Sequence, residues 1–400
     1  MRNQTFLFLS TTDWDAPQFG SRQQIALQLA RRGHRVLFVE IPRALHSFIS
    51  DPAGTRRALR RLGRIRRVPN GPLVYTPPPV LPVYYSPAVN ALNQRLLLYY
   101  LRRVLGRLGL RPDVLWTYWP NTAFLIGRLG ERVSVYHCID DFAAAGYPIT
   151  SRRAIVRMEA RQCRKVDLIL ARTAALAAAK RRLNPNTHFL PGGVDTDHFD
   201  PSQVTAPPPE VAALPRPRVG FVGTIDDRLD VSLLARCAKA LPAATIVLVG
   251  PVKRHRVDLR PLRGLGNVRF LPPCPHSQVP AIVEAFDVCL IPYRVNEYTS
   301  GLSPVKLYEY LAMGKPVIAT NLPYVRREAA HIRIGETPQE FLAEVRAALV
   351  PRSMGALGSS PSTQEREKWR AVAQAHSWER QVSEIERRLE PLLEGDACTP

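Results

Sequence analysis

The sequence predicts an α/β protein made of two doubly wound domains. Short apolar runs alternate with amphipathic segments along most of the chain, an order typical of parallel sheets covered by helices. The alternation stops at a proline-rich stretch, residues 201–217, and then begins again. The chain has 400 residues, of which 46% are hydrophobic and 22% are charged. These values are those of a globular protein with two or three domains, and they exclude a disordered or fibrous chain.

The first domain begins with a strand–helix–strand unit. Thr5–Leu9 and Arg35–Val39 are predicted strands, and the amphipathic segment between them is a predicted helix that ends at Gly33. Strands joined in this way are parallel, so the polar loop after the first strand lies at the carboxyl edge of the sheet, where open α/β folds bind ligands. Four further apolar runs, each ending in polar residues, are predicted strands: 113–120, 133–142, 166–173 and 187–195.

Two arginine-rich stretches interrupt this order. Residues 54–67 hold seven arginines. Within them Leu59, Leu62 and Ile65 are spaced three apart, which favours an amphipathic basic helix over part of the stretch. Residues 93–111 contain too many apolar side chains for one helix face, so we expect a helix that is buried on more than one side.

The second domain repeats the strand–loop–helix order. Its predicted strands lie in the runs 218–228, 245–250, 267–272, 288–293 and 316–320, and a final helix covers residues 364–393. We therefore predict an N-terminal domain over residues 1–204, a proline-rich linker over 205–217 and a C-terminal domain over 218–363. Residues 364–400 are expected to form a C-terminal helix that packs back towards the N-terminal domain.

The formal net charge of +21 is unevenly spread. Residues 1–200 carry 30 basic and 13 acidic side chains, whereas residues 201–400 carry 25 and 21. A nucleic-acid-binding protein would place exposed aromatic side chains or a known module beside its basic stretches. Residues 54–67 contain no aromatic side chain, so we do not expect nucleic acid as a partner. Only 7 of the 55 basic residues are lysine, so part of the charge reflects a bias towards arginine codons.

The cysteines and the apolar runs bear on the compartment. The six cysteines include no C-x-x-C pair, so neither a disulfide framework nor a cysteine metal site is predicted. The first apolar run is too short for a signal peptide, and no run reaches the roughly 20 residues that span a bilayer. We expect a cytoplasmic protein. The hypothesis for its basic half is peripheral attachment to anionic lipid on the inner face of the cytoplasmic membrane, through residues 54–67 and 93–111.

The segment Thr299–Thr320, TSGLSPVKLYEYLAMGKPVIAT, has the features of an anion-binding helix start. Ser303 is a candidate cap and Pro304 a candidate first helical residue. The amides of Gly301, Leu302 and Ser303 would then be unpaired at the positive end of a helix, where phosphate binds well.

Two side chains inside the same helix extend this interpretation. Lys306 lies one turn further along and is placed to reach the same anion. Glu309 lies three residues beyond Lys306, on roughly the same helix face. A carboxylate at that place can accept two hydroxyl hydrogen bonds, which is what a ribose offers. A surface ion pair between the two side chains is the alternative.

The P-x-K-x-x-E-x-x-A-x-G-K-P-V pattern of this segment resembles the donor-site helix of GT-B-fold glycosyltransferases, specifically family 4, the glycosyl transferases group 1. The resemblance covers nearly the whole chain. FGSRQQIALQLARRGHRV is similar to the family's N-terminal glycine loop, helix and strand, and LPGGVDTDHF to its element before the linker. VGTIDDRLD is similar to the first strand and loop of its nucleotide domain, and SVYHCIDDF to the strand that brings a His or Asp towards the donor sugar.

A subset that acts in bacterial cell-surface polysaccharide synthesis, including teichuronic-acid-type transferases, is similar in G-x-I-D-x-R-x-D and K-L-Y-E-Y-L-A. The resemblance implies the GT-B fold, in which two Rossmann-like domains face each other across a cleft. It implies a glycosyltransferase of the hexosyltransferase type (EC 2.4), which moves a sugar from a nucleotide diphosphate sugar to a hydroxyl of a glycan or lipid-linked acceptor. The C-terminal domain would hold the donor, the N-terminal domain the acceptor, and the reaction would retain the anomeric configuration.

The resemblance also assigns residues. Glu309 would bind the ribose, Lys306 and Arg228 would neutralise the leaving diphosphate, and His137 would contact the transferred sugar. His137, Arg228 and Lys306 are thus the implied catalytic residues. The implied donor contacts are Gly20, Gly223, Thr224, Arg228, Ser300, Gly301, Leu302, Ser303, Lys306, Leu307 and Glu309. Arg228 follows two aspartates and could instead pair with them, and His137 could be a hydrogen-bonded core histidine.

Three positions depart from the family pattern. The family often has two glutamates eight residues apart, and Gly301 stands where the first would fall. No lysine follows Arg228 nearby, and Gly192 replaces the usual Asn. Two alternatives therefore stay open: a catalytically degenerate subunit that only binds sugar nucleotides, and a non-hydrolysing nucleotide-sugar epimerase.

The expected chemistry needs no metal ion. Asp13–Asp15 and Asp195–Asp197 both spell D-x-D, a metal motif of another glycosyltransferase fold, but they fall in an N-terminal loop and a domain-connecting element. A helix dipole with Arg and Lys would stabilise the leaving charge instead. In a retaining reaction the leaving phosphate would take the acceptor proton. An inverting reaction would need a base, for which Asp15, His137 and Asp140 are candidates.

Overall fold

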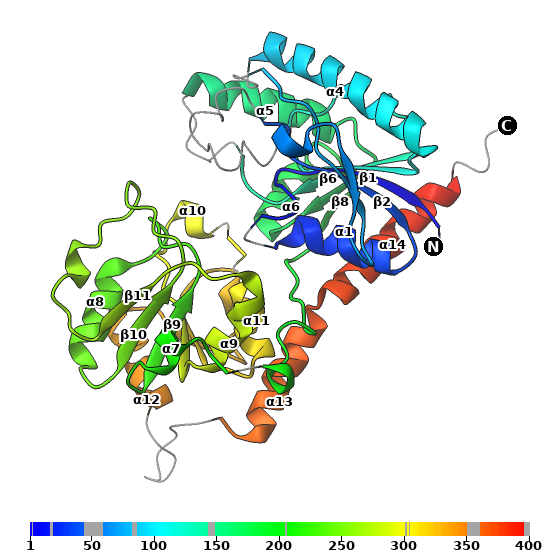
Figure 1. Cartoon of the computed structure of the whole chain (residues 1–400). Helices are drawn as coiled ribbons and strands as arrows, with labels where there is room; N and C mark the ends of the chain where they lie inside the picture. The colour runs from blue at the N-terminus through cyan, green and yellow to red at the C-terminus, as the bar shows by residue number, and fades with distance from the viewer. Residues whose placement is uncertain are drawn as a thin grey trace. The chain divides into compact units, whose positions relative to one another are not determined.

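The computed structural model describes residues 1, 3–16, 19–43, 59–81, 86–142, 149–204, 206–300, 302–303, 305–349 and 361–395. The chain forms two compact units (Figure 1). The first is Met1–Pro191 with Trp378–Pro400, and the second is Gly192–Ser377, which includes the proline-rich residues 201–217. Each unit has one mainly parallel sheet with helices packed on it. This arrangement confirms the predicted doubly wound α/β class.

The sheet of the first unit has eight strands in the order β3-β4-β2-β1-β5-β6-β7-β8. Neighbouring strands are parallel, except that β3 runs antiparallel to β4. The central strands are buried along their whole length because helices cover both faces, which explains their continuous apolar runs. The strands are β1 (Thr5–Leu9), β2 (Arg35–Val39), β3 (Ile65–Arg67), β4 (Leu73–Tyr75), β5 (Val114–Thr117), β6 (Val133–Cys138), β7 (Leu168–Ala171) and β8 (Thr187–Phe189).

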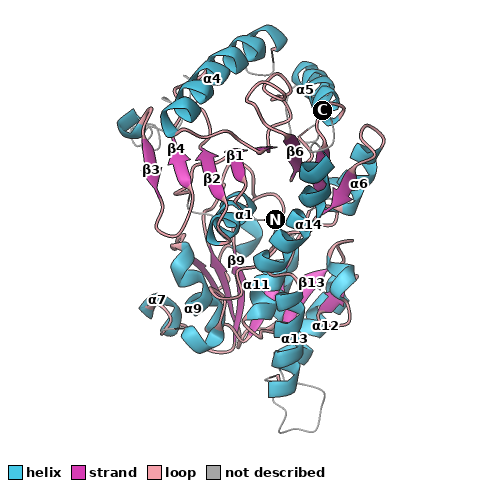
Figure 2. Cartoon of the chain, turned by 90° about the vertical axis from the view of Figure 1, so that its right-hand side faces the viewer, coloured by secondary structure: helices cyan, strands magenta, loops and turns pink. Residues whose placement is uncertain are grey.

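Helices cover the two faces of this sheet (Figures 1 and 2). They are α1 (Ser21–Arg31), α4 (Pro87–Leu108), α5 (Ile149–Cys163), α6 (Ala174–Arg181) and α14 (Trp378–Gly395). On one face Trp116 packs with Ile25 of α1 and Ile385 of α14. On the other face Leu115 packs with Leu101 of α4. Alternate residues of a strand thus belong to different cores, as the pleat requires.

Two elements differ from the sequence prediction, and a third agrees with it in part. Residues 44–58 lie outside the described residues; within the remainder of 54–67, residues 59–61 are helical and Ile65–Arg67 form strand β3, so helix covers part of this stretch, as expected. Helix α4 is buried on one side only, because Leu92, Leu96 and Tyr99 are exposed. The predicted single helix over 364–393 is two helices, α13 (Thr363–Ala375) and α14, separated at His376 and Ser377.

The sheet of the second unit has six parallel strands in the order β11-β10-β9-β12-β13-β14. They are β9 (Arg218–Val222), β10 (Thr245–Val249), β11 (Val268–Leu271), β12 (Val288–Ile291), β13 (Val317–Thr320) and β14 (Arg333–Gly335). The α-helices are α7 (Pro209–Ala212), α8 (Val231–Ala240), α9 (Val279–Glu284), α10 (Glu297–Ser300), α11 (Lys306–Ala312), α12 (Pro338–Leu349) and α13. Short 3₁₀ helices cover Pro201–Gln203, Arg260–Leu262, His276–Gln278 and Val325–Glu328.

The described part of the chain has no helix long and apolar enough to cross a membrane. Five of the six cysteines are described; all five are free thiols, and four of them are buried.

Candidate functional site

The carboxyl ends of β9 and β10 come together at two glycines of the second unit. Gly223 follows β9 with a φ of 150°, and Gly250 follows β10 with a φ of 138°, a region that glycine favours. A Cβ on Gly250 would lie 2.2 Å from the carbonyl oxygen of Gly223, so only glycine permits this approach. The amide of Lys253 also donates to the carbonyl of Ile225 at 2.9 Å. The loop after β10 is thereby fixed beside the loop after β9 that holds Thr224 and Arg228.

Lys306 lies in the first turn of α11 and reaches the end of β9. Its Nζ donates a hydrogen bond to the hydroxyl of Tyr293 at 2.8 Å. The same atom lies 5.2 Å from the ring centroids of both Phe221 and Tyr293. A Cβ on Gly223 would come within 3.4 Å of Nζ, so glycine there leaves space for the amine. An ammonium has three donors, and within the described chain only one of them is used, which leaves two for an anion.

Arg228 is held at the same edge by Asp226. Its Nε and Nη2 donate to the two carboxylate oxygens of Asp226 at 2.7 and 2.8 Å, and its guanidinium carbon lies 5.8 Å from the centroid of the Tyr293 ring. Burial, the largest single effect, opposes the charge on Arg228, but the hydrogen bonds to Asp226 together with the fields of Tyr293 and Asp226 raise the pKa. Arg228 therefore pairs with a neighbouring aspartate, which was one of the two interpretations of the sequence. It occupies one two-donor edge of the guanidinium and leaves Nη1 for a ligand.

Glu309 presents an unpaired carboxylate. It is half-buried in α11, and its carboxylate oxygens have no hydrogen bond or ion pair with any described residue. Burial raises the pKa of this carboxyl to about 6, and the charge of Lys306 opposes the shift only in part. The alternative interpretation of the sequence, an ion pair of Lys306 with Glu309, does not form in the structure. A partly desolvated carboxylate without partners is a group that two hydroxyl donors would satisfy.

Helix α11 is fixed by the tyrosines that flank Glu309. The hydroxyl of Tyr308 donates to Glu328 at 3.1 Å, and its ring stacks on His376 with centroids 4.1 Å apart. The hydroxyl of Tyr310 accepts the amide of Val222 at 3.0 Å, directly at the end of β9. These buried contacts hold Lys306 and Glu309 in place on a helix of only seven residues.

The predicted start of this helix is wrong by two residues. The N-cap is Val305, and Ser303 caps nothing: its hydroxyl is buried without a hydrogen-bond partner among the described residues. The amide of Leu302 donates to the carbonyl of Thr299, so it is not free for phosphate. The amide of Ser300 is likewise used, by Asn296. Gly301 and Pro304 lie outside the described residues.

Two further predicted donor-site residues, Thr224 and Leu307, differ in how far their side chains are buried. Thr224 is half-buried in the loop after β9. Leu307 is fully buried, so only its backbone could face a ligand.

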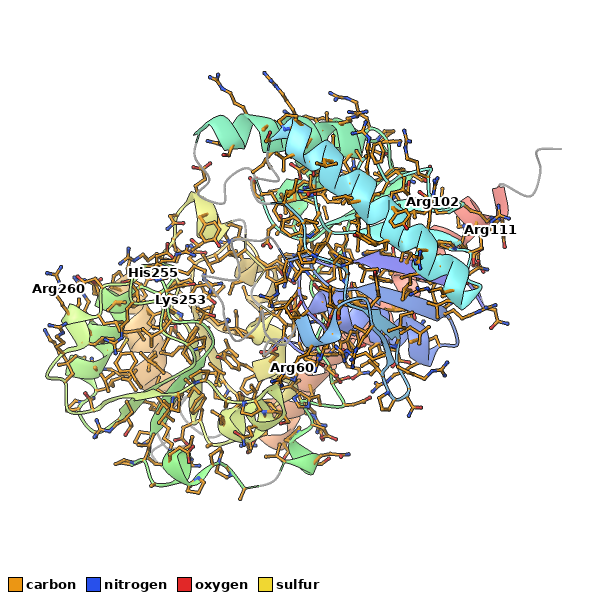
Figure 3. The ribbon with its side chains drawn as sticks, turned by 45° about the horizontal axis from the view of Figure 1, so that its top comes forward. Arg60, Arg102, Arg111, Lys253, His255 and Arg260 are labelled. Atoms are coloured by element: carbon orange, nitrogen blue, oxygen red, sulfur yellow. The ribbon has the colours of Figure 1, made fainter. Side chains whose placement is uncertain are left out.

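Sequence reasoning missed two residues of this region. Tyr293 touches both candidate cations, and its only sequence signal was an aromatic residue at the end of a predicted strand. Lys253 lies on the loop that pairs with Ile225, distant in sequence from Arg228 (Figure 3 labels it with His255). Its side chain is exposed.

In the first unit, the amide of Gly20 is already used. Gly20 is the N-cap of α1, and its amide donates to the side chain of Gln23 at 3.2 Å. The prediction that this amide contacts a diphosphate is therefore not supported by its hydrogen bonding. A Cβ on Gly20 would meet no atom within 4 Å, so packing within the described chain does not require glycine there.

His137 is a buried residue near the end of β6. Only 2% of its surface is exposed, and its ring lies 5.6 Å from that of Trp116 and 5.1 Å from that of Tyr118. Burial lowers the pKa of His137 to about 3, and the charges of Arg172 and Arg22 add to the effect. The imidazole is therefore neutral at physiological pH. Its Nδ1 has no hydrogen-bond partner among the described residues, so it is not a satisfied core histidine.

The two acceptor-side aspartates differ. Asp15 forms ion pairs with Arg61 and Arg66. Asp140 is exposed just beyond β6 and has no ion pair within the described part of the chain.

A pocket of about 370 Å³ opens in the first unit, at the carboxyl ends of β1, β2 and β5. Its wall combines apolar side chains and Trp119 with amide and hydroxyl groups, namely Thr11, Asn90, Asn93, Gln94, Asn121 and Thr122. Asp13 lines it, whereas Asp15 does not. Burial raises the pKa of Asp13, against the opposing charge of Arg43. Sequence reasoning noted Asp13 only as part of a D-x-D.

The described residues contain no group of three His, Cys, Asp or Glu side chains that could hold a metal ion. The second unit instead places Lys306 and Arg228 at the carboxyl edge of its sheet, next to the carboxylate of Glu309, which has no partner among the described residues. This arrangement can bind a polyanion that also carries a pair of hydroxyl groups.

Residues 216–350 match the family model described as glycosyl transferases group 1. A Bacillus subtilis (strain 168) protein, TuaH, which is assigned to teichuronic acid biosynthesis as a glycosyltransferase, is 26% identical over 282 residues; these cover 66% of this chain and 68% of that protein.

Solved structures share the fold. Sucrose-phosphate synthase from Thermosynechococcus elongatus aligns with a TM-score of 0.68 at 17% identity, over 98% of this chain and 100% of that one. Anabaena Alr3699/HepE in complex with UDP-glucose aligns with a TM-score of 0.62 at 15% identity, over 97% of this chain and 100% of that one. The likeness confirms the GT-B fold that the sequence predicted. Together, the family match over residues 216–350, the Bacillus relative and the shared fold show that this chain is a glycosyltransferase with the GT-B fold, whose residues 216–350 are similar to the glycosyl transferases group 1.

Proposed function

We propose that this chain transfers a sugar from a nucleotide diphosphate sugar to an acceptor hydroxyl, with retention, in the synthesis of a bacterial cell-surface polysaccharide or glycolipid. The observation that carries the donor assignment is Glu309, a half-buried carboxylate that no described side chain satisfies, three residues from Lys306. The solved relative with UDP-glucose and the assignment of TuaH to teichuronic acid biosynthesis support the donor class and the pathway class.

In the proposed donor site, Glu309 accepts the two ribose hydroxyls. Lys306 and the free edge of Arg228 neutralise the charge that grows on the diphosphate as the glycosidic bond breaks. Two cations preorganised against Tyr293 do this without a metal ion, because their hydrogen bonds to Tyr293 and Asp226 already fix them. Thr224 and the side-chain hydroxyls of Ser300 and Ser303 remain the proposed contacts to the rest of the donor.

In the proposed retaining reaction, the leaving phosphate takes the proton of the acceptor hydroxyl, so no side-chain base is required. The burial of His137 agrees with this proposal, because an imidazole with a pKa of about 3 is a weak base at neutral pH. His137 is proposed to contact the transferred sugar as a neutral hydrogen-bonding group. If the reaction inverts, Asp13 joins Asp15 and Asp140 as a candidate base, because its carboxyl has a raised pKa and lines the pocket of the first unit.

We place the acceptor in that pocket. Trp119 offers an apolar face to a sugar ring, and the carboxamide of Gln94 makes no hydrogen bond within the described chain although it is 94% buried. Thr11 also keeps an unpartnered hydroxyl there. Amides and hydroxyls next to an aromatic ring suit a neutral glycosyl unit of a glycan or lipid-linked acceptor.

The membrane hypothesis now has a defined surface, the exposed side of α4. Leu92, Leu96 and Tyr99 are 45%, 38% and 58% exposed and lie on one stripe of this helix. The exposed arginines around the stripe are Arg95, Arg102 and Arg103, and Figure 3 shows Arg102 on α4 and Arg111 just beyond it. Apolar side chains among cations suit an anionic bilayer surface, where each basic residue contributes about 1 kcal/mol.

Vesicle flotation tests the membrane proposal. We expect binding to vesicles that contain anionic lipid, less binding to neutral vesicles, and a loss in Leu96→Asp. Phe270→Asp removes an equally exposed apolar side chain from β11 and is the matched control. Equal flotation with both lipid mixtures contradicts the proposal.

Calorimetric titration with UDP tests the donor assignment. Wild type and the control Glu336→Ala, an exposed carboxyl of the same unit, should bind UDP. Glu309→Ala should bind at least about 10-fold more weakly, because hydrogen bonds to a charged group contribute about 1.5–3 kcal/mol. Absence of UDP binding by wild type refutes the proposal. With a membrane extract as acceptor source, labelled product supports the transferase, whereas epimerised donor or binding without turnover supports one of the two alternatives.

A further inference from the structure

The first unit carries a second cluster of polar side chains, separate from the pocket of the proposed acceptor. Tyr118 follows β5, His137 lies in β6 and Arg172 follows β7, and they are joined by Arg22 from the first turn of α1. The register places them on one face: Trp116, Val135 and Leu170 belong to the core under α1, so the residues two positions further along each strand point the same way.

Ring and guanidinium distances show that the cluster is compact. The guanidinium carbon of Arg22 lies 5.7 Å from the centroid of the Tyr118 ring, and the rings of Tyr118 and His137 lie 5.1 Å apart. The amide of Arg172 donates to the carbonyl of Cys138 at 2.9 Å, which sets Arg172 directly beside the end of β6.

Four polar atoms of this cluster are shielded from solvent and have no hydrogen-bond partner among the described residues. They are Nε of Arg22, Nε of Arg172, Nδ1 of His137 and the hydroxyl of Tyr118. A buried polar group without a partner is unfavourable, and folded proteins leave few of them. Four such atoms in one place, two of them on the buried side chains of Tyr118 and His137, indicate that a ligand supplies the missing partners.

The charge of the cluster indicates that the ligand is an anion. Two guanidinium groups meet there, and neither forms an ion pair with a described carboxylate. Among the described carboxylates, Asp140 acts on Arg22, through its field alone. Burial lowers the pKa of Arg22, so its cation is already partly desolvated. A guanidinium presents Nε and one Nη as a two-donor edge, which matches the two oxygens of a carboxylate or phosphate.

We propose that Arg22 and Arg172, with His137, form a subsite for an anionic group on a sugar substrate of this chain. The proposal rests on the proposed function, because it assumes that the chain binds sugars. The anionic group has two sources of the same chemistry: the carboxylate of a uronosyl donor or the phosphate of a sugar-phosphate acceptor. The neutral imidazole of His137 contributes one hydrogen bond and no charge.

Steady-state turnover distinguishes the two sources. One arm compares UDP-glucuronate with UDP-glucose as donor, and the other compares glucose 6-phosphate with glucose as acceptor. In the arm that matches the true substrate, the anionic substrate should have the higher kcat/KM. Arg172→Gln or Arg22→Gln should lower the kcat/KM of the anionic substrate by about 10- to 100-fold and should change that of the neutral substrate little. Arg157→Gln removes an exposed arginine of α5 in the same unit and is the control. An equal loss for both members of a pair overturns the proposal, because the arginines then bind a group common to both.

Binding of small probes tests the subsite without turnover. We expect glucuronate, glucose 6-phosphate or inorganic phosphate at millimolar concentration to shift the imidazole NMR signals of His137, because the anion cancels the field of Arg22 and Arg172. Neutral glucose should not shift them, and Arg172→Gln should abolish the effect, with Arg172→Lys restoring it in part. No shift with any of the three anions overturns the subsite even when UDP binding succeeds. Failure of UDP binding instead points to the proposed function.

Discussion

Replacement of Glu309 by glutamine separates two effects of this carboxylate, the destabilisation of the fold and the binding of UDP. Burial raises its pKa from 4.5 to about 6. The folded chain then binds the proton more tightly than the unfolded chain, so ionised Glu309 destabilises the fold at pH values above about 6. Ionisation of Glu309 lowers the free energy of unfolding by about 2 kcal/mol at pH 8, and this loss disappears as the pH falls through 6 towards 4.5.

Glu309→Gln should therefore be more stable than wild type at pH 8, by up to about 2 kcal/mol, and no more stable at pH 4. Denaturant unfolding followed by circular dichroism at the two pH values measures this difference. Glu336→Gln, which removes an exposed carboxyl of the same unit, should leave stability unchanged at both.

The same variant should lose affinity for UDP. Ribose hydroxyls donate to the ionised carboxylate, so binding of UDP by wild type should weaken as the pH falls through about 6, and the variant should bind weakly at every pH. Calorimetric titration at pH 5 and pH 8 measures both. Unchanged UDP affinity in Glu309→Gln at pH 8 would refute the ribose assignment, and lower stability at pH 8 would refute the desolvation argument.

Three other changes test separate parts of the molecule. Lys306→Met keeps the packing against Phe221 and Tyr293 but removes the charge, so kcat should fall by about 100-fold or more with little loss of stability. A fall only in UDP affinity would show that Lys306 acts in the ground state alone. Gly223→Ala should destabilise the chain by about 1 kcal/mol or more in urea unfolding, because φ is 150° there; an equally stable variant would show that the loop relaxes. Leu389→Ala removes a fully buried side chain of α14 and should cost about 2–5 kcal/mol; a smaller cost would mean that α14 does not complete the core of the first unit.

Strands were the elements most readily predicted. A parallel strand that helices cover on both faces must be apolar along its length, and the runs ending near Leu9, Val39, Val222 and Ile291 have that property without reference to any distant residue. The strands are parallel, as predicted, so the polar residues after these runs lie at the carboxyl edge of each sheet; ligand binding there stays a prediction.

Helix starts and surface faces were less predictable. Ser303 was expected to cap a helix, but the first turn begins at Lys306, because buried contacts of Tyr308 and Tyr310 fix where α11 sits. Helix α4 was expected to be buried on several sides, yet its Leu96 side faces outward, since the sheet can cover only one side of it. Local propensity does not report either constraint.

The sequence by itself determined the α/β class, the repeated strand–loop–helix order and the segment that carries Lys306 and Glu309, because each of these is written in residues close together in the chain. Only the tertiary structure decided that Tyr293 holds Lys306 and that Asp226 occupies one edge of Arg228. It also decided that Arg22 and Arg172 lie around His137 without an ion pair to any carboxylate of the described residues. Those contacts join the ends of different strands, and strand order in a parallel sheet is set by crossover connections and packing rather than by neighbouring residues. The desolvation that raises the pKa of Glu309 has the same origin, since it comes from the packing around α11.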